Sequence, residues 1–320
     1  MSHLRILQLR PDCKYGESQH LFVAHSHATG YSNQGTSRAR DPAPGSISRC
    51  TGSLKSETPH LKDADKGNYL MARQWKPREF DLLYDEFICR DEMHFGGRAY
   101  YLRYRSRYKE CIERFAGLAP PPPIDTLDVG GGQLALMCTK LWGDHGVVAD
   151  LPGQHLSYMA AHGVETHQWN LLRAEPPLLA KFDFVFFSEV IEHLPIPGHI
   201  ILERLRKVLR PGGVLICTTP NLYRLRNVVY MTLGREIFDY FQYPDDEKAL
   251  SHVLEYSRDH LDWQFRKAGF TQYRVEYSQM HHSPTNPLFR PLAWLGYPLH
   301  LVPRWRDNLV ATAFVPTDTA

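Results

Sequence analysis

The sequence predicts an α/β protein in which seven mostly parallel strands form one sheet with helices on both faces. Beyond residue 124, apolar runs of strand length alternate with segments of helical period. The run at 182–187 is almost wholly apolar, as expected of a strand that helices cover on both sides. Repeated strand–helix units favour parallel pairing, because each helix returns the chain to the same edge of the sheet.

Residues 1–75 are expected to be irregular, loop-rich or disordered. Segment 24–60 is rich in Ser, His, Gly, Arg and Pro and has no lasting hydrophobic period. A helical extension is expected over 76–119, with Gly96-Gly97 separating two helices. Three tyrosines of the second helix could line a pocket or pack against the next domain, and packing is favoured: Tyr101, Tyr104 and Tyr108.

The α/β domain is expected over 120–320. Its first strand is Ile124–Val129, and Gly130-Gly131-Gly132 makes the turn into a helix over Ala135–Trp142. A second apolar run then ends in Asp150. The glycines let the backbone approach a ligand closely, and a carboxylate at that strand end can accept hydrogen bonds from both ribose hydroxyls. This strand–turn–helix–strand unit predicts a nucleoside-binding site.

The remaining elements follow from apolar period and punctuation. A helix with an apolar face over 201–209 is expected to stop at Pro211-Gly212-Gly213, and Ser257 is expected to cap another helix that ends at Gly269. The other expected strands are Val164–His167, Phe182–Phe187, Val214–Cys217, Phe270–Tyr277 and Leu309–Val315. Two inserts interrupt the pattern, at 222–252 and at 281–306.

Composition excludes several classes of protein. Of 320 residues, 43% are hydrophobic, so a sizeable core is available. The net charge is only +2, and the Lys and Arg residues are scattered, which argues against electrostatic binding of nucleic acid. The six cysteines show no ligand spacing, and buried thiols are expected. Neither a signal peptide nor an apolar run of about 18 residues is found, so a cytoplasmic protein is expected.

Polar or glycine-rich residues follow each of the first five expected strands. Ligands of open α/β sheets bind beyond the carboxyl ends of the strands. These residues should therefore gather around one site: Gly130–Gly132, Asp150, Trp169–Leu171, Glu189–His193 and Thr218–Asn221.

Residues 120–278 resemble the class I S-adenosylmethionine-dependent methyltransferases. The most specific matches are Leu127–Gly132, Phe182–Leu194 and Leu209–Gly213, with Thr219-Pro220-Asn221 also similar. The branch that is most similar includes quinone-biosynthesis O-methyltransferases and many sugar and natural-product methyltransferases. The resemblance implies a Rossmann-like, doubly wound sheet, S-adenosylmethionine as cofactor and methyl transfer as the activity.

The resemblance also implies the roles of individual residues. Asp128, Gly130, Gly131 and Gly132 would shape the turn around the methionine part of the cofactor. Asp150, with Leu151 beside it, would bind the ribose hydroxyls. The adenine would be bordered by Trp169, Asn170 and Leu171. Glu189 would lie near the amino-acid end of the cofactor and the methyl path.

One departure from the family pattern is Leu134, where the family often has a third glycine. The alternative for the whole unit is a nicotinamide-binding domain, whose G-x-G-x-x-G pattern places a pyrophosphate on a helix N-terminus. Here Ala135 stands at the last glycine position, a tolerated variant. The segment Glu189-Val190-Ile191-Glu192-His193 favours methyl transfer instead.

His193 is the candidate general base, because an imidazole pKa near 6.5 suits proton transfer at neutral pH. The alternative is that His193 only caps or packs its turn. Glu192 could orient the His193 ring, although an exposed helix carboxylate is favoured. No metal site is expected, because neither His25 and His27 nor His281-His282 has a partner cluster nearby in sequence.

The expected acceptor is a hydroxyl of a small or glycan-like molecule, with amine or carbon less favoured. The aromatic insert 222–252 suits a lid over the acceptor or an extra packed helix pair. Insert 281–306 suits a peripheral membrane contact, a homodimer face or a pocket wall. A non-catalytic subunit that binds cofactor without turnover is the alternative function. A protein or RNA methyltransferase ranks lower, because no Asn/Asp-Pro-Pro-Tyr/Phe motif follows the fourth strand.

Overall fold

The computed structural model describes residues 73–90, 97–173, 175–237, 252–280 and 297–317, and all structural statements refer to these. Most of the expectations for residues 1–75 lie outside them, including those for His25 and His27. Much of both inserts, at 238–251 and 281–296, also lies outside the described residues.

Seven strands form one mixed sheet in the order β3-β2-β1-β4-β5-β7-β6. All pairings from β3 to β5 are parallel, whereas β7 runs antiparallel to both β5 and β6. The predicted parallel character therefore holds for one side of the sheet only. The strands are β1 Asp125–Val129, β2 His145–Asp150, β3 Glu165–Gln168, β4 Phe182–Ser188, β5 Leu209–Pro220, β6 Gln272–Ser278 and β7 Asn308–Phe314.

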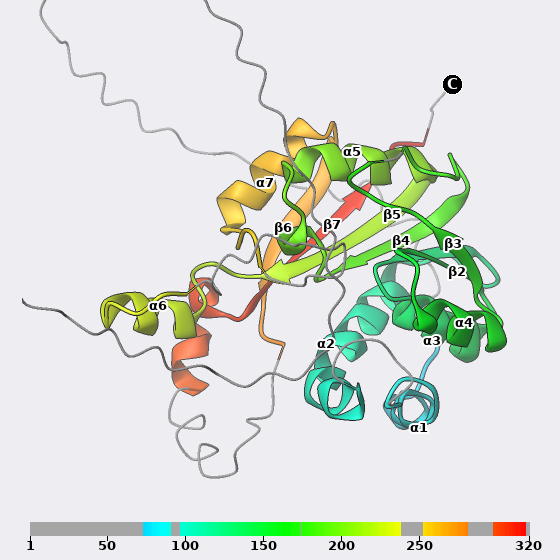
Figure 1. Ribbon diagram of the computed structural model, residues 1–320, viewed down its shortest axis with the longest axis horizontal. Helices are drawn as coiled ribbons and strands as arrows, with labels where there is room; N and C mark the ends of the chain where they lie inside the picture. Colours follow the sequence, from blue (N-terminus) through cyan, green and yellow to red (C-terminus); the bar gives the residue numbers. More distant parts are fainter. Residues whose placement is uncertain (1–72, 91–96, 174, 238–251, 281–296, 318–320) are drawn as a thin grey trace, which may run out of the picture. The chain divides into compact units, whose positions relative to one another are not determined.

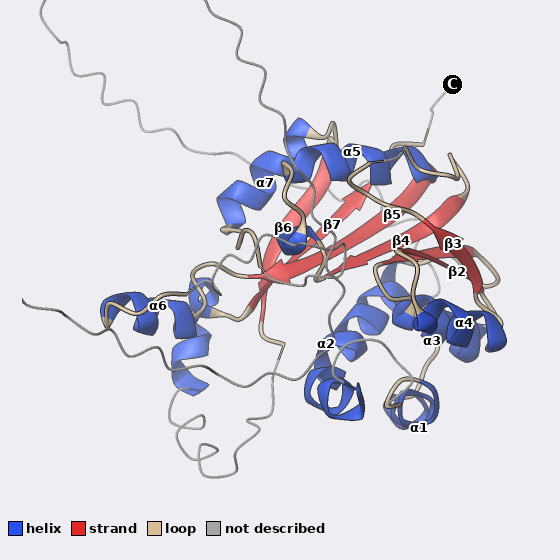
Figure 2. Cartoon of the chain, in the orientation of Figure 1, coloured by secondary structure: helices blue, strands red, loops and turns tan. Residues whose placement is uncertain are grey.

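Helices cover both faces of the sheet, as Figures 1 and 2 show. Side chains of α1, α2, α3 and α4 join one core cluster, and side chains of α5 and α7 join the other. The α-helices are α1 Pro77–Phe87, α2 Gly97–Leu118, α3 Gln133–Trp142, α4 Gln154–Ala161, α5 Gly198–Val208, α6 Leu225–Thr232 and α7 Arg258–Lys267. The 3₁₀ turns are η2 Ile191–His193, η4 Tyr297–Leu301 and η5 Pro303–Trp305.

Strand β4 shows how the sequence builds two cores. Successive side chains of a strand point to opposite faces of the sheet. Phe184 and Phe186 pack against Phe115 of α2, with ring centroids 4.7 and 5.5 Å away, while Val185 and Phe187 belong to the core beneath α5 and α7. The four consecutive apolar residues Phe184–Phe187 are therefore what the middle of this central strand requires.

Pro211-Gly212-Gly213 follows the end of a helix, as predicted, but these residues already lie inside the next strand. Helix α5 ends at Val208, and these residues lie inside β5, which is much longer than the predicted Val214–Cys217. Gly212 has a φ of +81°, and the pairing of β5 with β4 shifts register here. The glycines let the strand bend without leaving the sheet.

Other sequence expectations for this domain are confirmed or refined. The Ser257 hydroxyl accepts a hydrogen bond from the His260 amide at 3.2 Å and caps α7 as predicted. The described cysteines are Cys89, Cys111, Cys138 and Cys217, and all four are buried.

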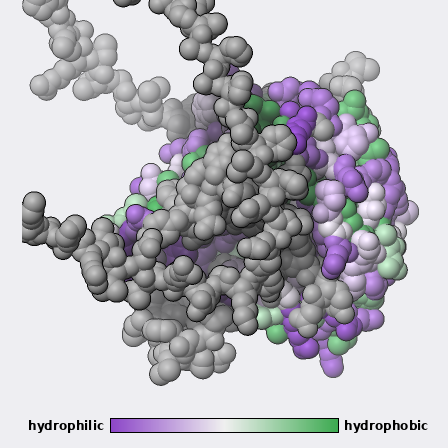
Figure 3. Space-filling view, viewed as in Figure 1, coloured by the Kyte–Doolittle hydropathy of each residue, from purple (hydrophilic) through white to green (hydrophobic). Residues whose placement is uncertain are grey.

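The molecular surface is mixed in character where it can be seen. In Figure 3 the coloured part of the visible face interleaves hydrophilic and hydrophobic residues. Among the described residues, no helix combines the length and the apolar character needed to cross a membrane. Insert 281–306 is described from residue 297 onward, where Leu299, Leu301 and Val302 are exposed.

Candidate active site

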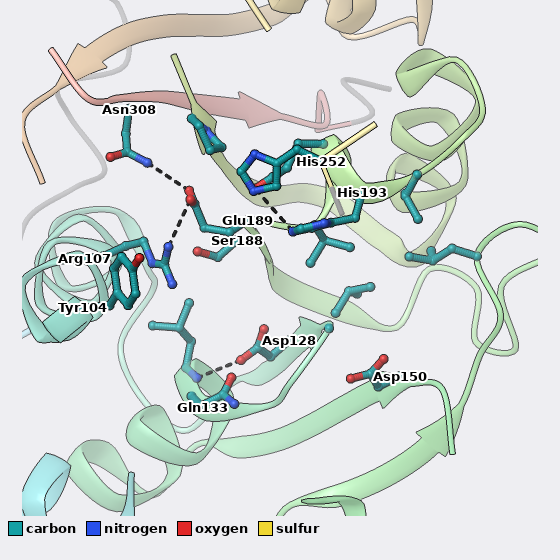
Figure 4. A pocket seen from close by; sticks show the side chains of 18 of the residues that line it. Tyr104, Arg107, Asp128, Gln133, Asp150, Ser188, Glu189, His193, His252 and Asn308 are labelled. Atoms are coloured by element: carbon teal, nitrogen blue, oxygen red, sulfur yellow. Dashed lines mark hydrogen bonds and ion pairs between the residues drawn. The ribbon is translucent and has the colours of Figure 1, made fainter. Parts of the chain in front are cut away.

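A cavity of about 520 Å³ opens at the carboxyl ends of β1, β2 and β4. This volume lies within the range of about 300–1,000 Å³ typical of small-molecule sites. All ten cofactor-site residues predicted from sequence border it except Gly131 and Gly132, which form the adjoining turn. Figure 4 labels the side chains that define its two sides: Tyr104, Arg107, Asp128, Gln133, Asp150, Ser188, Glu189, His193, His252 and Asn308.

The glycine turn after β1 is held by the buried carboxylate of Asp128. Its Oδ2 accepts hydrogen bonds from the amides of Leu134 at 2.7 Å and Ala135 at 3.4 Å, at the start of α3. Burial raises the pKa of Asp128 to about 7, although these amide hydrogen bonds act in the opposite direction. Gly130, Gly131 and Gly132 have φ values of +93°, +134° and +86°, a backbone that favours glycine.

Asp150 ends β2 at the wall of the cavity. Its Oδ1 accepts a hydrogen bond from the Leu151 amide at 2.7 Å, and its Oδ2 lies 3.0 Å from His155 Nε2. Each carboxylate oxygen can accept a further hydrogen bond from a ligand hydroxyl. Trp169 and Leu171 give the same side of the cavity an apolar wall, and the backbone amide of Trp169 is bonded to the carbonyl of Asp150 at 3.0 Å.

Asn170, which lies between Trp169 and Leu171 in the sequence, also borders the cavity. Its Oδ1 accepts a hydrogen bond from the Leu172 amide at 2.9 Å. That bond orients the Asn170 side chain at the cavity wall.

Glu189 directly follows β4 and is held from three elements. Its Oε2 forms an ion pair with Arg107 Nη1 of α2 at 3.0 Å, and both side chains are nearly buried. Its Oε1 accepts hydrogen bonds from Thr218 Oγ1 at 2.9 Å and from Asn308 Nδ2 at 3.1 Å. The residue has a φ of +56°, which is uncommon outside glycine and marks a constrained turn.

Arg107 and Asn308 are site residues that the sequence reasoning missed. Arg107 also donates to the Tyr100 hydroxyl at 2.8 Å, and its guanidinium lies 4.6 Å from the ring centre of Tyr104. Burial lowers the pKa of Arg107, but the negative charge of Glu189, together with the neighbouring tyrosines, raises it by more. The pKa of Arg107 is therefore well above its usual value. Arg107 is one of five arginines in α2, and their spacing does not single it out. Asn308 reaches the site only through the antiparallel return of β7.

The tyrosines of α2 combine the two roles considered from sequence. Tyr101 is fully buried in the core, whereas Tyr100, Tyr104 and Tyr108 border the cavity. Tyr101 also accepts a hydrogen bond from Gln133 Nε2 at 3.1 Å, next to the glycine turn. Helix α2 thus contributes both to the core and to the site.

Glu192 is not the exposed helix carboxylate that was expected. It lies in η2 with 1% of its side chain exposed, and its Oε2 accepts a hydrogen bond from Thr219 Oγ1 at 3.0 Å. Burial raises the pKa of Glu192 well above its usual value, and the negative charge of the nearby Glu189 adds to this shift. The side chain of Glu192 is buried because the residues of η2 form a 3₁₀ turn that packs against β5 instead of a helix on the surface.

His193 borders the cavity on the side away from Asp150, as Figure 4 shows. Its ring stands edge-on to that of His252, with centroids 4.8 Å apart. His252 is the last residue of the predicted lid insert 222–252. Of the other aromatic lid residues, Tyr223 and Tyr230 are exposed, and those from 238 to 243 lie outside the described residues.

The features of this cavity fit a sulfonium nucleoside cofactor. Left-handed glycine backbone forms the turn after β1, the Asp150 carboxylate ends β2 at the cavity, and the Trp169 indole gives the cavity an apolar wall. A strand–turn–helix–strand unit of this kind in a seven-stranded mixed sheet defines a class I S-adenosylmethionine-dependent methyltransferase. A family model described as "Methyltransferase domain" matches residues 101–275, more than half of the chain, and the protein belongs to that family. It is an enzyme that uses S-adenosylmethionine.

A relative with a curated description is the tRNA U34 carboxymethyltransferase of Chromohalobacter salexigens. It is 31% identical over 163 residues, which cover 43% of this chain and 45% of that protein. The chain therefore matches less than half the length of this relative.

Two solved structures are similar to this chain, and the first of them shares its fold. A chain from the complex of the Haloferax volcanii Trm112 methyltransferase activator with a methyltransferase aligns with a TM-score of 0.50 at 16% identity, covering 74% of this chain and 98% of that one. An S-adenosylmethionine-dependent methyltransferase from Archaeoglobus fulgidus aligns with a TM-score of 0.46 at 13% identity, covering 73% and 99%.

Proposed function

We propose that the enzyme transfers a methyl group to a hydroxyl of a small or glycan-like molecule, as in the branch of quinone-biosynthesis and sugar or natural-product O-methyltransferases. The observation that carries the proposal is the position of His193. It borders the cavity at the end of η2, the turn that follows β4, and lies on the side away from Asp150. A hydroxyl that receives the methyl group must lose its proton, so a base is needed near this point. An amine or a sulfur nucleophile depends less on such a base.

Bound S-adenosylmethionine supplies an electrophilic methyl carbon on a good leaving group. Asp150 and the Gly130 turn hold the nucleoside and methionine parts, and Trp169 borders the purine. Glu189 and Arg107 fix the wall beside the methyl path. His193 promotes removal of the acceptor proton, with a positioned base typically contributing about 10²–10⁴-fold. Alignment of the acceptor oxygen with the methyl carbon contributes about 7–11 kcal/mol in well-oriented systems.

An RNA or nucleotide acceptor is the second candidate, contrary to the expectation of no nucleic acid. The curated relative is described as a tRNA enzyme. Besides Arg107, which is paired with Glu189, three arginines border the cavity, Arg103, Arg224 and Arg226, and such side chains suit phosphate. Arg224 is already paired with the buried carboxylate of Glu255, so Arg103 and Arg226 are the ones that could meet a phosphate.

The first test is calorimetric titration with S-adenosylmethionine and its demethylated product, with NAD(P) in parallel. We expect micromolar binding by the native protein and loss of at least about 100-fold in Asp150→Ala, because a ligand hydroxyl pair loses its acceptor. Asp259→Ala on the exposed start of α7 is the matched control and should bind normally. Equal binding by both variants would remove Asp150 from the site.

The second test is methyl transfer from labelled cofactor to phenol, catechol and sugar acceptors and, separately, to unmodified tRNA. Transfer to a hydroxyl acceptor that His193→Gln reduces by about 10²-fold or more supports the proposal. Transfer only to tRNA would favour the second candidate. Transfer to small molecules that His193→Gln leaves unchanged would show that His193 has no part in the chemistry.

A further inference from the structure

We infer that Glu192, His193 and His252 form a divalent-metal site on the acceptor side of the cavity. One ligand atom from each residue lies within 4.8 Å of the other two. Glu192 and His193 come from η2, whereas His252 comes from the segment that precedes α7. In Figure 4 the His193 and His252 rings point toward one another at the cavity, next to Glu189.

The Glu192 carboxylate supplies the strongest independent indication of a ligand. Its Oε2 accepts the Thr219 hydroxyl hydrogen bond, but its Oε1 is buried without a hydrogen-bond partner among the described residues. That oxygen lies 3.9 Å from His193 Nε2, beyond hydrogen-bond distance. A cation between these two atoms would give the buried oxygen the partner that it otherwise lacks.

His252 is oriented in the way that metal-binding histidines usually are. Its Nδ1 lies 3.4 Å from Glu255 Oε1, and Glu255 is itself held by Arg224 and by Asn227 Nδ2 at 2.5 Å. A carboxylate on one ring nitrogen fixes the ring and leaves the other nitrogen to bind a metal. The Glu255 cluster therefore serves as the outer support of the site.

The donor set indicates the class of metal. Two imidazoles and one carboxylate suit a first-row divalent ion such as Mn²⁺, Fe²⁺ or Zn²⁺, and such three-ligand sites keep open positions. The cysteines of the described residues are buried elsewhere, so no thiolate contributes to this set.

The catalytic role of this ion rests on the proposed function. The acceptor hydroxyl would bind at an open position, where the positive charge lowers its pKa and the proton passes to solvent. The oxygen would use a lone pair to form the bond to the methyl carbon. The carbon–sulfur bond would break at the same time, and its electron pair would stay on sulfur, which becomes a neutral thioether. His193 would in this case act by holding the ion, and not by taking the proton itself.

Metal binding is tested without any acceptor. Chelator-stripped protein saturated with the demethylated cofactor is titrated with Mn²⁺, Zn²⁺ and Mg²⁺ by calorimetry. We expect one Mn²⁺ or Zn²⁺ per chain with a dissociation constant below about 0.1 mM. His193→Gln, His252→Gln and Glu192→Gln should each weaken binding by at least about tenfold while binding of the demethylated cofactor persists.

The matched control is His145→Gln, at the opposite end of β2. His145 also lies beside two carboxylates, at 2.8 Å from Asp125 and 3.0 Å from Glu165, so it reports adventitious binding by a surface histidine. Metal affinity should not change in this variant. No binding of Mn²⁺ or Zn²⁺ by the native protein, or equal binding by the native protein and His252→Gln, overturns the inference.

Rates of methyl transfer then separate this inference from the proposed function. Activity that EDTA abolishes and Mn²⁺ or Zn²⁺ restores supports both. Metal binding together with transfer to a non-hydroxyl acceptor would retain the site and overturn the proposed function. Transfer to a hydroxyl that EDTA leaves unchanged, with no metal bound, would retain the function and overturn the site.

Discussion

Gly130 combines two requirements at the residue scale, a left-handed backbone and close contact with a neighbouring loop. A Cβ at this position would lie 2.5 Å from Val190 Cγ2, at a φ of +93°. We predict that Gly130→Ala destabilises the protein by about 1–3 kcal/mol and weakens cofactor binding, because strain and the displaced Val190 both affect the turn. Urea unfolding and calorimetry measure the two effects.

Gly117 is the matched control for that substitution. It lies in α2 with a Cβ position that meets nothing within 4 Å. Gly117→Ala should stabilise the protein by about 0.4–1 kcal/mol, since it restricts the unfolded chain. Similar effects of the two substitutions would contradict the role assigned to the Gly130 backbone.

The raised pKa of Asp128 predicts a pH dependence of stability. The folded pKa is about 7, above that of an ordinary aspartate, so the folded protein retains a proton that the unfolded chain releases. The resulting stabilisation is present below about pH 4 and is lost as the pH rises to about 7, with a slope of at most about 1.4 kcal/mol per unit. Asp128→Asn removes this titration.

The free energy of unfolding should therefore be compared between native protein and Asp128→Asn from pH 4.5 to 8. The difference is expected to move in favour of the variant up to about pH 7 and then to stay constant. A difference that does not vary with pH would show that Asp128 is ionised throughout.

At the scale of elements, the ion pair between Arg107 and Glu189 joins α2 to the end of β4. Its N–O distance is 3.0 Å, and both side chains are nearly buried. Arg107→Met should destabilise the protein by about 3–5 kcal/mol, because it leaves a buried carboxylate without its cation. A double-mutant cycle with Glu189→Gln should give a coupling energy of about 0.5–3 kcal/mol in urea unfolding at pH 7.

The exposed pair of Lys207 and Glu203 on α5 provides the comparison. Its N–O distance is 3.6 Å, and solvent reaches nearly half of each side chain. Its coupling energy should not exceed about 0.5 kcal/mol. If the Arg107–Glu189 coupling were no larger than this, α2 would not depend on the pair for its position.

At the scale of the whole molecule, one ligand contacts segments from many parts of the chain. Residues of α2, of the first four strand ends and of β7 border the same cavity. Demethylated cofactor at about 100 times its dissociation constant should add about 2.7 kcal/mol to the free energy of unfolding. The Tm should rise by roughly 5–10 °C. Scanning calorimetry of native protein and Asp150→Ala checks this, and an equal shift in both would place the ligand elsewhere.

The sequence by itself determined the local elements and the residues at the strand ends. Val129 closes an apolar run before three glycines, and Asp150 closes another, so both the turn and the carboxylate could be located from short-range pattern. The same pattern located the end of α5 before Pro211-Gly212-Gly213 but placed the start of β5 too late, because a proline and two glycines can also lie within a bent strand, and pairing with β4 decides this.

Only the tertiary structure decided which distant residues meet. The antiparallel course of β7 brings Asn308 to Glu189, and helix α2 brings Arg107 to the same carboxylate. The burial of Glu192 and its proximity to His252 likewise depend on how η2 and the segment before α7 fold together. Hydrophobic period records which face of an element is buried, whereas long-range polar contacts depend on the positions of whole elements, which no local spacing encodes.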